Sequence, residues 1–319
     1  RGESTKRAFL NGKLSLASAE GLIDMINGES EAEVRAGYSL YAEKLTSAVR
    51  GLQEKLTEIL AGIDADIDFP EEDIEHTDLA DVGARIGDIG EEIERMLATY
   101  RTGKKIKEGV TVVLAGRPNT GKSSVLNALL GADKAIVSAV AGTTRDAVEG
   151  TLEIEGVRFQ LIDTAGIRAS ADEVESVGIE RARGYIERAD LILFITDGAA
   201  PWSAEDEAVW QSVQGRRCLI VCNKNDLAAS EEAGGPAPDL RVSARTGENI
   251  AALRQKIFDL CLAEYRADGE FLIEERHFAA LTRAGEELRT AERLAGQVPL
   301  DLLGVHLKAA WEALGEISG

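Results

Sequence analysis

VTVVLAGRPNTGKSS, residues 110–124, is the stretch of sequence that decides the fold. It begins with a β-branched, apolar run typical of a buried strand, and SSVLNALLG after it has a helical pattern. Between them, Gly116 to Ser123 match G-x-x-x-x-G-K-[ST], the phosphate-binding loop, in the strand-loop-helix context that this motif requires. Such a loop wraps a triphosphate in backbone N–H groups, which requires glycine at Gly116 and Gly121.

The side chains of this loop are those that a bound triphosphate and its metal ion need. Lys122 can reach the β- and γ-phosphates, and the Ser123 hydroxyl can ligate Mg²⁺. Four further loop residues complete the predicted nucleotide contacts: Asn119, Thr120, Gly121 and Ser124. A plain glycine-containing turn remains the alternative for this window alone, so the rest of the nucleotide site has to decide.

The composition limits what the chain can do. Its 319 residues are enough for two domains or more, each with its own core. The 56 acidic and 36 basic residues give a formal net charge of −20, which argues against general binding of polyanions. The 3 cysteines are too few for a disulfide framework, so a reducing, cytoplasmic location is expected. No apolar run approaches ~18 residues, so no membrane span is expected.

The chain begins at Arg1 with neither an initiator Met nor a signal peptide. We therefore expect it to be part of a longer protein.

Helical patterns flank the loop on both sides. Apolar residues from Tyr38 to Ile67 recur at three- and four-residue steps, which predicts one stripe along a long helix. A second stripe runs from Leu79 to Tyr100, and the pattern returns after Gly269, with a break at Pro299. Because each helix must bury one face, we expect all of them to pack together. Two separate helical appendages are the alternative.

Between these helices the pattern is that of alternating strands and helices. Residues 110–115, 191–196 and 218–222 predict buried parallel strands, and 151–163 predict a hairpin at the sheet edge. The charged residues 104–109 are expected to form a connector. The predicted fold is a doubly wound, mostly parallel α/β domain inserted into an all-α helical bundle. The α/β domain is placed at 108–264, and the two parts of the bundle at 17–107 and 265–319.

Four further motifs follow in the order that a GTPase needs. In GTTRD, residues 142–146, a threonine can reach Mg²⁺ and the γ-phosphate, and in DTAG, 163–166, the carboxylate can hold Mg²⁺ through water. In NKND, 223–226, the Asp226 carboxylate can accept hydrogen bonds from guanine N1–H and N2–H₂, which adenine lacks. SAR, 243–245, can place a backbone N–H at guanine O6. The predicted nucleotide contacts are thus Thr143, Thr144, Asp163, Thr164, Ala165, Gly166, Asn223, Lys224, Asp226, Ser243, Ala244 and Arg245.

The hydrolytic machinery departs from that of many small GTPases. The position where a Gln orients the attacking water is Ile167, which cannot do so. No arginine finger can be assigned either. The charge that develops between the β- and γ-phosphates must therefore be met in another way.

The chain resembles the MnmE (TrmE) family of tRNA-modification GTPases. The resemblance rests on GRPNTGKSS, AGTTRD, DTAGIR with DEVESVGIERA, NKND and SARTGE, and outside the α/β domain on RAFLNGKLSLASAE, DADIDFPEED and LGEISG. It covers essentially the whole chain. In that family a P-loop GTPase domain is inserted in a helical domain, as the stripes also indicate.

The resemblance implies that K⁺, bound beside the β- and γ-phosphates, supplies the missing positive charge. The implied K⁺ ligands are Asn119, Ser138, Val140 and Thr143, and the implied Mg²⁺ ligands include Ser123 and Thr144. A monovalent cation held by neutral oxygens stabilises the charge of phosphoryl transfer as an arginine would.

The resemblance also implies the catalytic residues. Glu175 matches the family's catalytic glutamate, which positions the attacking water through a second water, and Arg168 matches a switch arginine. Lys122 completes the predicted catalytic set. Without the family match, Glu175 would be interpreted as an exposed acid of a switch loop.

The family's partners follow from the same resemblance. Together with MnmG, an FAD protein, its members modify C5 of the wobble uridine (U34) of certain tRNAs, with a one-carbon unit from a tetrahydrofolate derivative. They are homodimers, and their GTPase domains pair when K⁺ and GTP are bound. Residues 1–16 are expected to be a remnant of the family's folate-binding domain, in which Lys13 matches a folate contact, and the family's C-terminal C-x-G-K tail is expected to be missing.

Two other functions remain open at this stage. A regulatory, ribosome-assembly-type GTPase switch would need an RNA-binding module rich in Lys and Arg, which the sequence lacks. A helical scaffold with a vestigial nucleotide site would not need complete motifs.

Other reactive side chains are interpreted structurally. Cys218 and Cys222 are expected to pack in the core, and Trp202 and Trp210 to be packing residues. The histidines, His76, His277 and His306, are expected to be solvated or to cap helices.

Overall fold

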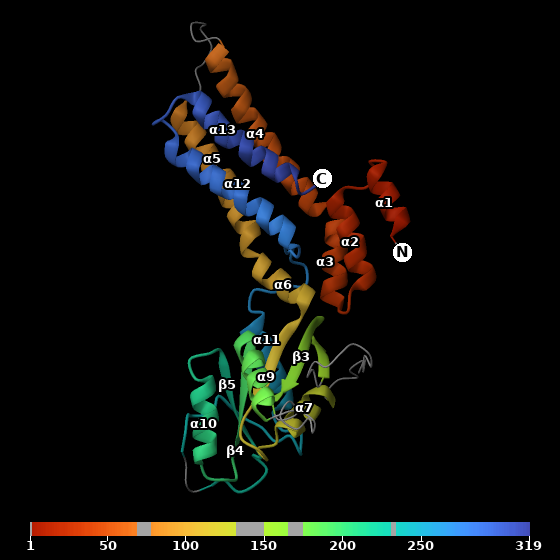
Figure 1. Cartoon of the computed structure of the whole chain (residues 1–319), viewed down its shortest axis with the longest axis vertical. Helices are drawn as coiled ribbons and strands as arrows, with labels where there is room; N and C mark the ends of the chain where they lie inside the picture. Colours follow the sequence, from red (N-terminus) through yellow and green to blue (C-terminus); the bar gives the residue numbers. More distant parts are fainter. Residues whose placement is uncertain (1, 69–77, 132–149, 165–174, 231–233) are drawn as a thin grey trace. The chain divides into compact units, whose positions relative to one another are not determined.

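The computed structural model describes residues 2–68, 78–131, 150–164, 175–230 and 234–319 (Figure 1). The chain divides into two compact units. The helical unit comprises Arg1–Lys107 and Arg266–Gly319, and the α/β unit comprises Glu108–Tyr265. The α/β unit is thus inserted into the helical one, as predicted.

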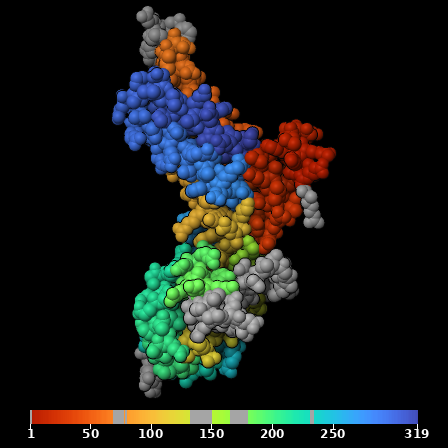
Figure 2. All heavy atoms as spheres, in the orientation of Figure 1, coloured from red at the N-terminus to blue at the C-terminus, as the bar shows by residue number. Residues whose placement is uncertain are grey.

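The helical unit contains α1 (Glu3–Leu10), α2 (Leu16–Asn27), α3 (Glu31–Tyr41), α4 (Lys44–Asp68), α5 (Leu79–Ala98), most of α6 (Tyr100–Glu108), α12 (Glu275–Leu294) and α13 (Leu300–Gly315). Helices α4, α5, α12 and α13 share one hydrophobic core. Figure 2 shows α12 and α13 in contact along their length on the face drawn. Segments on both sides of the insertion therefore bury each other's stripes, and the alternative of two separate helical appendages is wrong.

The first predicted stripe is only partly correct. Val49, Leu52 and Ile63 are buried in α4, but α3 ends at Tyr41 and α4 begins at Lys44. Glu43 between them has φ 62°, a left-handed conformation that a continuing helix cannot contain. Tyr38, on α3, consequently leaves the stripe and is 57% exposed.

The charged connector predicted at residues 104–109 is wrong for all but its last residue. Residues 100–108 form α6, and Ile106 points into the protein, with 1% of its surface exposed. Tyr100, at the start of α6, stacks on Phe278 of α12, with 4.3 Å between the ring centroids. The charges of KKIK are compatible with a helix because Lys104 is exposed and Lys107 is paired with Asp24 and Glu274, so neither charge is buried without a partner.

The prediction that His277 is solvated or caps a helix is also wrong. Its side chain is completely buried, and its Nε2 lies 2.8 Å from Oε2 of Glu20.

The α/β unit is built on β1 (Val110–Ala115), β2 (Gly150–Ile154), β3 (Val157–Asp163), β4 (Leu191–Asp197), β5 (Cys218–Asn223) and β6 (Leu240–Arg241). They form one sheet in the order β2-β3-β1-β4-β5-β6, parallel except for the β2–β3 pair. β2 and β3 form the predicted edge hairpin. Its turn residues, Glu155 and Gly156, have φ values of 51° and 81°, as a type I′ turn requires.

The helices of this unit are α7 (Lys122–Gly131), α9 (Glu175–Arg188), α10 (Ala204–Val213) and α11 (Ile250–Cys261). Phe194 of β4 packs against Trp202 and Trp210, which confirms that both tryptophans are packing residues. On β3, Phe159 packs against Phe258 of α11. No helix in the described ranges of either unit is long and apolar enough to cross a membrane.

Candidate nucleotide-binding site

The carboxyl ends of the parallel strands bring the sequence motifs to one edge of the sheet. Leu114 of β1 is in register with Asp163 of β3, and Asp197 of β4 with Asn223 of β5. After β1 the chain continues to β2 and β3 on one side of it and then crosses to β4 on the other side, so the loop after β1 lies at the topological switch point. Ligands of doubly wound α/β proteins bind at this position.

The glycines of the phosphate-binding loop are required by close approaches of other groups. A Cβ atom at Gly116 would lie 2.4 Å from the carbonyl oxygen of Ile195, and one at Gly121 would lie 2.3 Å from Nδ2 of Asn223. Gly121 also has φ 90° and Asn119 has φ 64°, both in the left-handed region. The loop therefore packs directly against β4 and Asn223 at two positions where a side chain would not fit.

Lys122 and Ser123 lie where the chemistry needs them. Lys122 is 5% exposed, and its Nζ donates to the carbonyl oxygens of Gly116 (2.9 Å) and Arg117 (2.8 Å), so the ammonium group spans the loop. The Ser123 hydroxyl donates to Oδ2 of Asp163, over 2.9 Å. The structure thus brings together two predicted Mg²⁺-site residues, a hydroxyl oxygen and a carboxylate, which are the oxygen donors that Mg²⁺ prefers.

Two threonines complete the inner wall of this site. Thr164 Oγ1 donates to the carbonyl oxygen of Leu114 at 2.9 Å, and Thr120 Oγ1 donates to that of Arg117 at 3.2 Å. Both side chains are buried and satisfied by backbone oxygens. Ser124, by contrast, is exposed on the first turn of α7.

Asp226, the residue predicted to contact a guanine base, is held by two side chains. Its Oδ1 accepts from the Ser243 hydroxyl (2.6 Å), and its Oδ2 accepts from Arg245 Nε (2.9 Å). The Ser243 hydrogen bond, with a further contribution from Arg245, holds the pKa of Asp226 below its ordinary value. The carboxyl group is therefore ionised at neutral pH, in the form that accepts from two N–H donors of guanine.

The side chain of Asn223 links two loops of the site. It is buried, and its Nδ2 donates to the carbonyl oxygen of Thr120 at 3.0 Å, while its Oδ1 accepts from the backbone N–H of Ala244 at 3.1 Å. One amide thus connects the phosphate-binding loop to the loop expected at guanine O6. Direct contact of Asn223 with a nucleotide stays a prediction.

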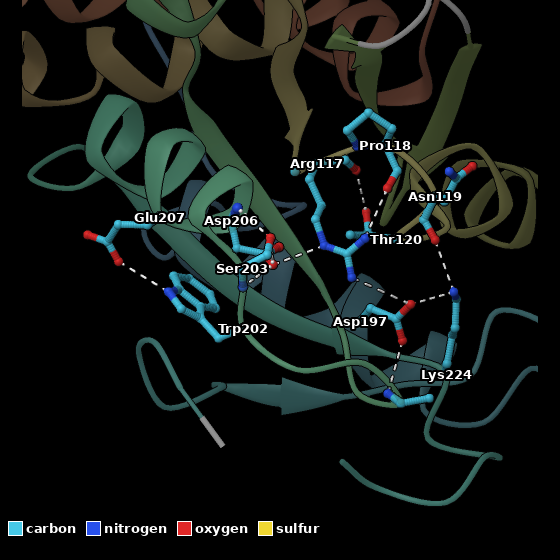
Figure 3. Close-up of polar contacts among 12 residues, drawn as sticks. Arg117, Pro118, Asn119, Thr120, Asp197, Trp202, Ser203, Asp206, Glu207 and Lys224 are labelled. Atoms are coloured by element: carbon cyan, nitrogen blue, oxygen red, sulfur yellow. Dashed lines mark hydrogen bonds and ion pairs between the residues drawn. The ribbon is translucent and has the colours of Figure 1, made fainter. Parts of the chain in front are cut away.

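A charged network beneath the loop was not expected from the sequence (Figure 3). Arg117 Nε donates to Oδ2 of Asp206 at 2.9 Å, and its guanidinium group lies 4.0 Å from Oδ2 of Asp197. Lys224 Nζ donates to the same Asp197 oxygen at 2.5 Å and to the carbonyl oxygen of Asn119 at 2.9 Å. The network holds the first half of the phosphate-binding loop from two sides.

Asp206 also forms the capping box of α10 with Ser203, whose backbone N–H donates to Oδ2 of Asp206. The sequence S-A-E-D at residues 203–206 has the spacing of a capping box, so this contact could have been predicted from the sequence. Its connection to Arg117 depends on a contact across 89 positions of sequence, which local patterns do not report.

The remaining predicted site residues fall into two groups. Ser138, Val140, Thr143, Thr144, Ala165, Gly166 and Arg168 lie outside the described residues, and Glu175 is described only as the first residue of α9. Lys13 belongs to the helical unit, where it is exposed in the turn after α1. Its contact with folate stays a prediction.

Comparison with known proteins identifies the family. Residues 16–319 match the family model described as the MnmE helical domain. The tRNA modification GTPase MnmE of Methylibium petroleiphilum is 42% identical in an alignment of 328 positions, which covers 100% of this chain and 70% of that protein. The chain belongs to the MnmE family of tRNA modification GTPases.

The MnmE of Desulforamulus reducens is 39% identical, and the alignment covers 100% of this chain and 71% of that protein. Among solved structures, Era of Aquifex aeolicus bound to GDP and AlF₄⁻ is 28% identical, covers 60% of this chain and 69% of that one, and has a TM-score of 0.37. The G domain of the T. maritima FeoB iron transporter covers 47% of this chain and 98% of its own, at 26% identity and a TM-score of 0.34.

Proposed function

We propose that this chain is a K⁺-activated GTP hydrolase whose GTP cycle serves the C5 modification of the wobble uridine of tRNA together with MnmG. Its membership of the MnmE family supports GTP hydrolysis and a role in tRNA modification. The finer statements concern the K⁺ ion, the MnmG partner and pairing of two copies through their α/β units. They rest on the resemblance and on the geometry of the site.

Mg²⁺ fits the residues present. Ser123 and Asp163 supply hard oxygen atoms that already lie 2.9 Å apart, on a helix N-terminus and a strand end that face the same loop. When bound, Mg²⁺ neutralises negative charge on the β- and γ-phosphates. Lys122, anchored across the loop, adds a positive charge at the same position.

The placement of Asn119 carries the proposal of a K⁺ site. Its backbone is in the left-handed conformation, and its carbonyl oxygen is held by Lys224. Figure 3 shows its side chain directed away from Lys224 and the charged network. The exposed amide therefore presents a neutral oxygen at the rim of the phosphate-binding loop, where it can serve as a ligand of a monovalent cation.

GTP turnover in KCl and in NaCl tests the proposed K⁺ site. We expect turnover to be roughly 10-fold or more higher in KCl, since removing one preorganised charge-stabilising group from phosphoryl transfer costs at least that much. Asn119→Ala should lower the rate in KCl to the level in NaCl without abolishing GTP binding, because the backbone contacts of the loop remain. Turnover is measured as phosphate release under saturating GTP and Mg²⁺.

Asn127→Ala is the matched control, because Asn127 is exposed on α7, outside the loop. It should keep the full response to K⁺. Equal turnover in the two salts would contradict the K⁺ site and leave GTP hydrolysis itself standing.

A further inference from the structure

The side chain of Arg117 connects the phosphate-binding loop to the start of α10 (Figure 3). Its Nε donates to Oδ2 of Asp206 at 2.9 Å, its Nη1 donates to the carbonyl oxygen of Pro118 at 3.4 Å, and its Nη2 lies 4.0 Å from Oδ2 of Asp197. Only 17% of the side chain is exposed. One planar guanidinium group thus contacts two carboxylates and the backbone of its own loop, a geometry that arginine can satisfy and lysine cannot.

Asp206 holds this arginine from a fixed position. Its side chain is buried, and the same Oδ2 accepts from the backbone N–H (3.0 Å) and the hydroxyl (2.7 Å) of Ser203 in the capping box of α10. Trp202, the residue before this box, packs edge-on against Phe194 of β4. The position of the carboxylate is therefore set by α10 and β4, and not by the loop that it holds.

The charges of this pair depend on each other. Oδ1 of Asp206 is buried with no hydrogen-bond partner in the described part of the chain, so Oδ2 makes the contacts of this carboxylate. An ionised carboxylate that is buried without a cation is strongly unfavourable. Arg117 is the cation with which Asp206 forms an ion pair. The ion pair consequently keeps Arg117 beside α10.

The position of Arg117 affects the groups that would contact phosphate. Its carbonyl oxygen accepts from Lys122 Nζ at 2.8 Å and from Thr120 Oγ1 at 3.2 Å. The carbonyl oxygens of Asn119 and Thr120 are also held by side chains, at 2.9 and 3.0 Å. Because the N–H and C=O groups of a planar peptide point in opposite directions, these contacts orient the N–H groups of the loop as well. A shift of Arg117 would therefore move the Lys122 ammonium group and the loop amides together.

We propose that Arg117 is a positioning residue for GTP hydrolysis, because its ion pair with Asp206 holds the phosphate-binding loop and Lys122 in the geometry that phosphoryl transfer requires. The inference rests on the proposed GTP hydrolysis, but not on the K⁺ site. Stabilisation of a transition state depends on donors placed to within a fraction of an ångström, whereas binding of a nucleotide is spread over many contacts. Loss of the ion pair should lower kcat and change KM little.

Arg117→Lys separates the geometry of this contact from its charge. The ammonium group can still neutralise Asp206, so the urea midpoint should stay near that of the parent chain, but it cannot reproduce the three contacts of the guanidinium group. We expect kcat to fall roughly 10-fold or more, as it does when a catalytic group is misplaced. KM for GTP and the affinity for GDP should stay within about 3-fold of the parent, because the contacts of the loop with bound nucleotide remain.

A double variant tests whether Arg117 serves only to neutralise Asp206. In Arg117→Met with Asp206→Asn no buried carboxylate needs a cation, and the new amide oxygen can still accept from Ser203. We expect the urea midpoint to recover relative to Arg117→Met alone, while kcat stays low. Arg216→Lys is the control, because Arg216 is exposed between α10 and β5, and it should keep the kcat of the parent.

Phosphate release at saturating Mg²⁺ in KCl gives kcat and KM, and fluorescence titration gives the affinity for GDP. Two outcomes would overturn the proposal. They are an unchanged kcat in Arg117→Lys, with or without a rise in KM, and full recovery of kcat in the double variant. Because Arg117→Lys keeps the charge of the pair, it decides the question even where Arg117→Met fails to fold. Turnover by the parent chain tests the proposed function separately, since this inference depends on the ratio of each variant to the parent.

Discussion

At the scale of single residues, the Asp226 carboxylate is already oriented and ionised for the guanine contact that the sequence predicts. Ser243 and Arg245 orient the carboxylate and keep its pKa low, so no proton would have to leave for that predicted contact. The direction of the shift means that the carboxylate stays ionised from neutral pH down into the acidic range. Guanine recognition should therefore be insensitive to pH between about 5 and 8.

Asp226→Asn should change which base the site accepts. An amide cannot accept from both N1–H and N2–H₂ of guanine, but it can donate to the C2 carbonyl of xanthine. We expect GTP affinity to fall on the order of 10²-fold and XTP affinity to rise. Fluorescence titration with both nucleotides measures the ratio, and Asp259→Asn, exposed on α11, is the control. An unchanged GTP-to-XTP ratio would refute this role for Asp226.

At the scale of elements, α2 and α3 approach so closely that two glycines meet. A Cβ at Gly21 would lie 2.5 Å from the carbonyl oxygen of Gly37, and one at Gly37 would lie 2.8 Å from the backbone nitrogen of Met25. Backbone atoms cannot move aside as a flexible side chain can. This contact depends on the absence of both side chains.

Gly21→Ala should therefore destabilise the helical unit. We expect a loss of roughly 2–3 kcal/mol in the free energy of unfolding, the usual cost of overpacking a rigid contact. Gly51→Ala on α4, where nothing lies within 4 Å of the added Cβ, should instead stabilise by about 0.5–1 kcal/mol. Urea midpoints followed by circular dichroism measure both. Similar midpoints for the two variants would show that α2 and α3 can separate at little cost.

Helices α2, α6 and α12 meet at an ion cluster. Lys107 Nζ lies 3.2 Å from Oδ1 of Asp24 and is also paired with Glu274. Oδ2 of Asp24 is buried with no hydrogen-bond partner among the described residues. Burial, followed by the neighbouring Glu274, raises the pKa of Asp24 to about 7, against the opposing effect of Lys107.

Asp24 should make the stability of the chain depend on pH. Between the ordinary pKa of 3.8 and about 7, the folded protein keeps a proton that the unfolded chain has lost. The contribution of Asp24 to stability is therefore present below pH 4 and declines as the pH rises toward 7. Asp24→Asn should remove this decline and be more stable than the parent by about 1–2 kcal/mol at pH 8.

Urea unfolding at pH 5 and pH 8 measures the effect of Asp24→Asn. Asp64→Asn, exposed on α4, is the control and should keep the pH dependence of the parent chain. A variant at Asp24 that loses stability equally at both values would mean that the carboxylate is charged throughout.

At the scale of the whole molecule, each unit has a core of its own. The buried residues shared by α4, α5, α12 and α13 include none from the sheet, and the clusters on β1 and β4 include none from those helices. The tryptophans are divided in the same way, because Trp202 and Trp210 belong to the α/β unit and Trp311 lies on α13.

GDP with Mg²⁺ should stabilise the α/β unit selectively. A ligand at 100 times its Kd contributes about 2.7 kcal/mol to the state that binds it. In a Trp311→Phe variant, fluorescence reports on the α/β unit alone, and its thermal transition should shift upward with GDP. The helical content followed by circular dichroism should show a second transition that does not move. One transition that shifts as a whole would contradict the independence of the two cores.

The amino-acid sequence by itself determined the inserted architecture, the nucleotide motifs and the family, because the local spacing and periodicity of its residues indicate them. The strands at 110–115 and 218–222 and the roles expected of Lys122 and Asp226 follow from such patterns. Only the tertiary structure decided where the first stripe breaks, at Glu43, and that residues 104–108 are helical. It alone also paired His277 with Glu20 across 257 positions and Arg117 with Asp206 across 89. The physical reason is that such contacts depend on which surfaces packing brings together, and this is a property of the folded chain as a whole.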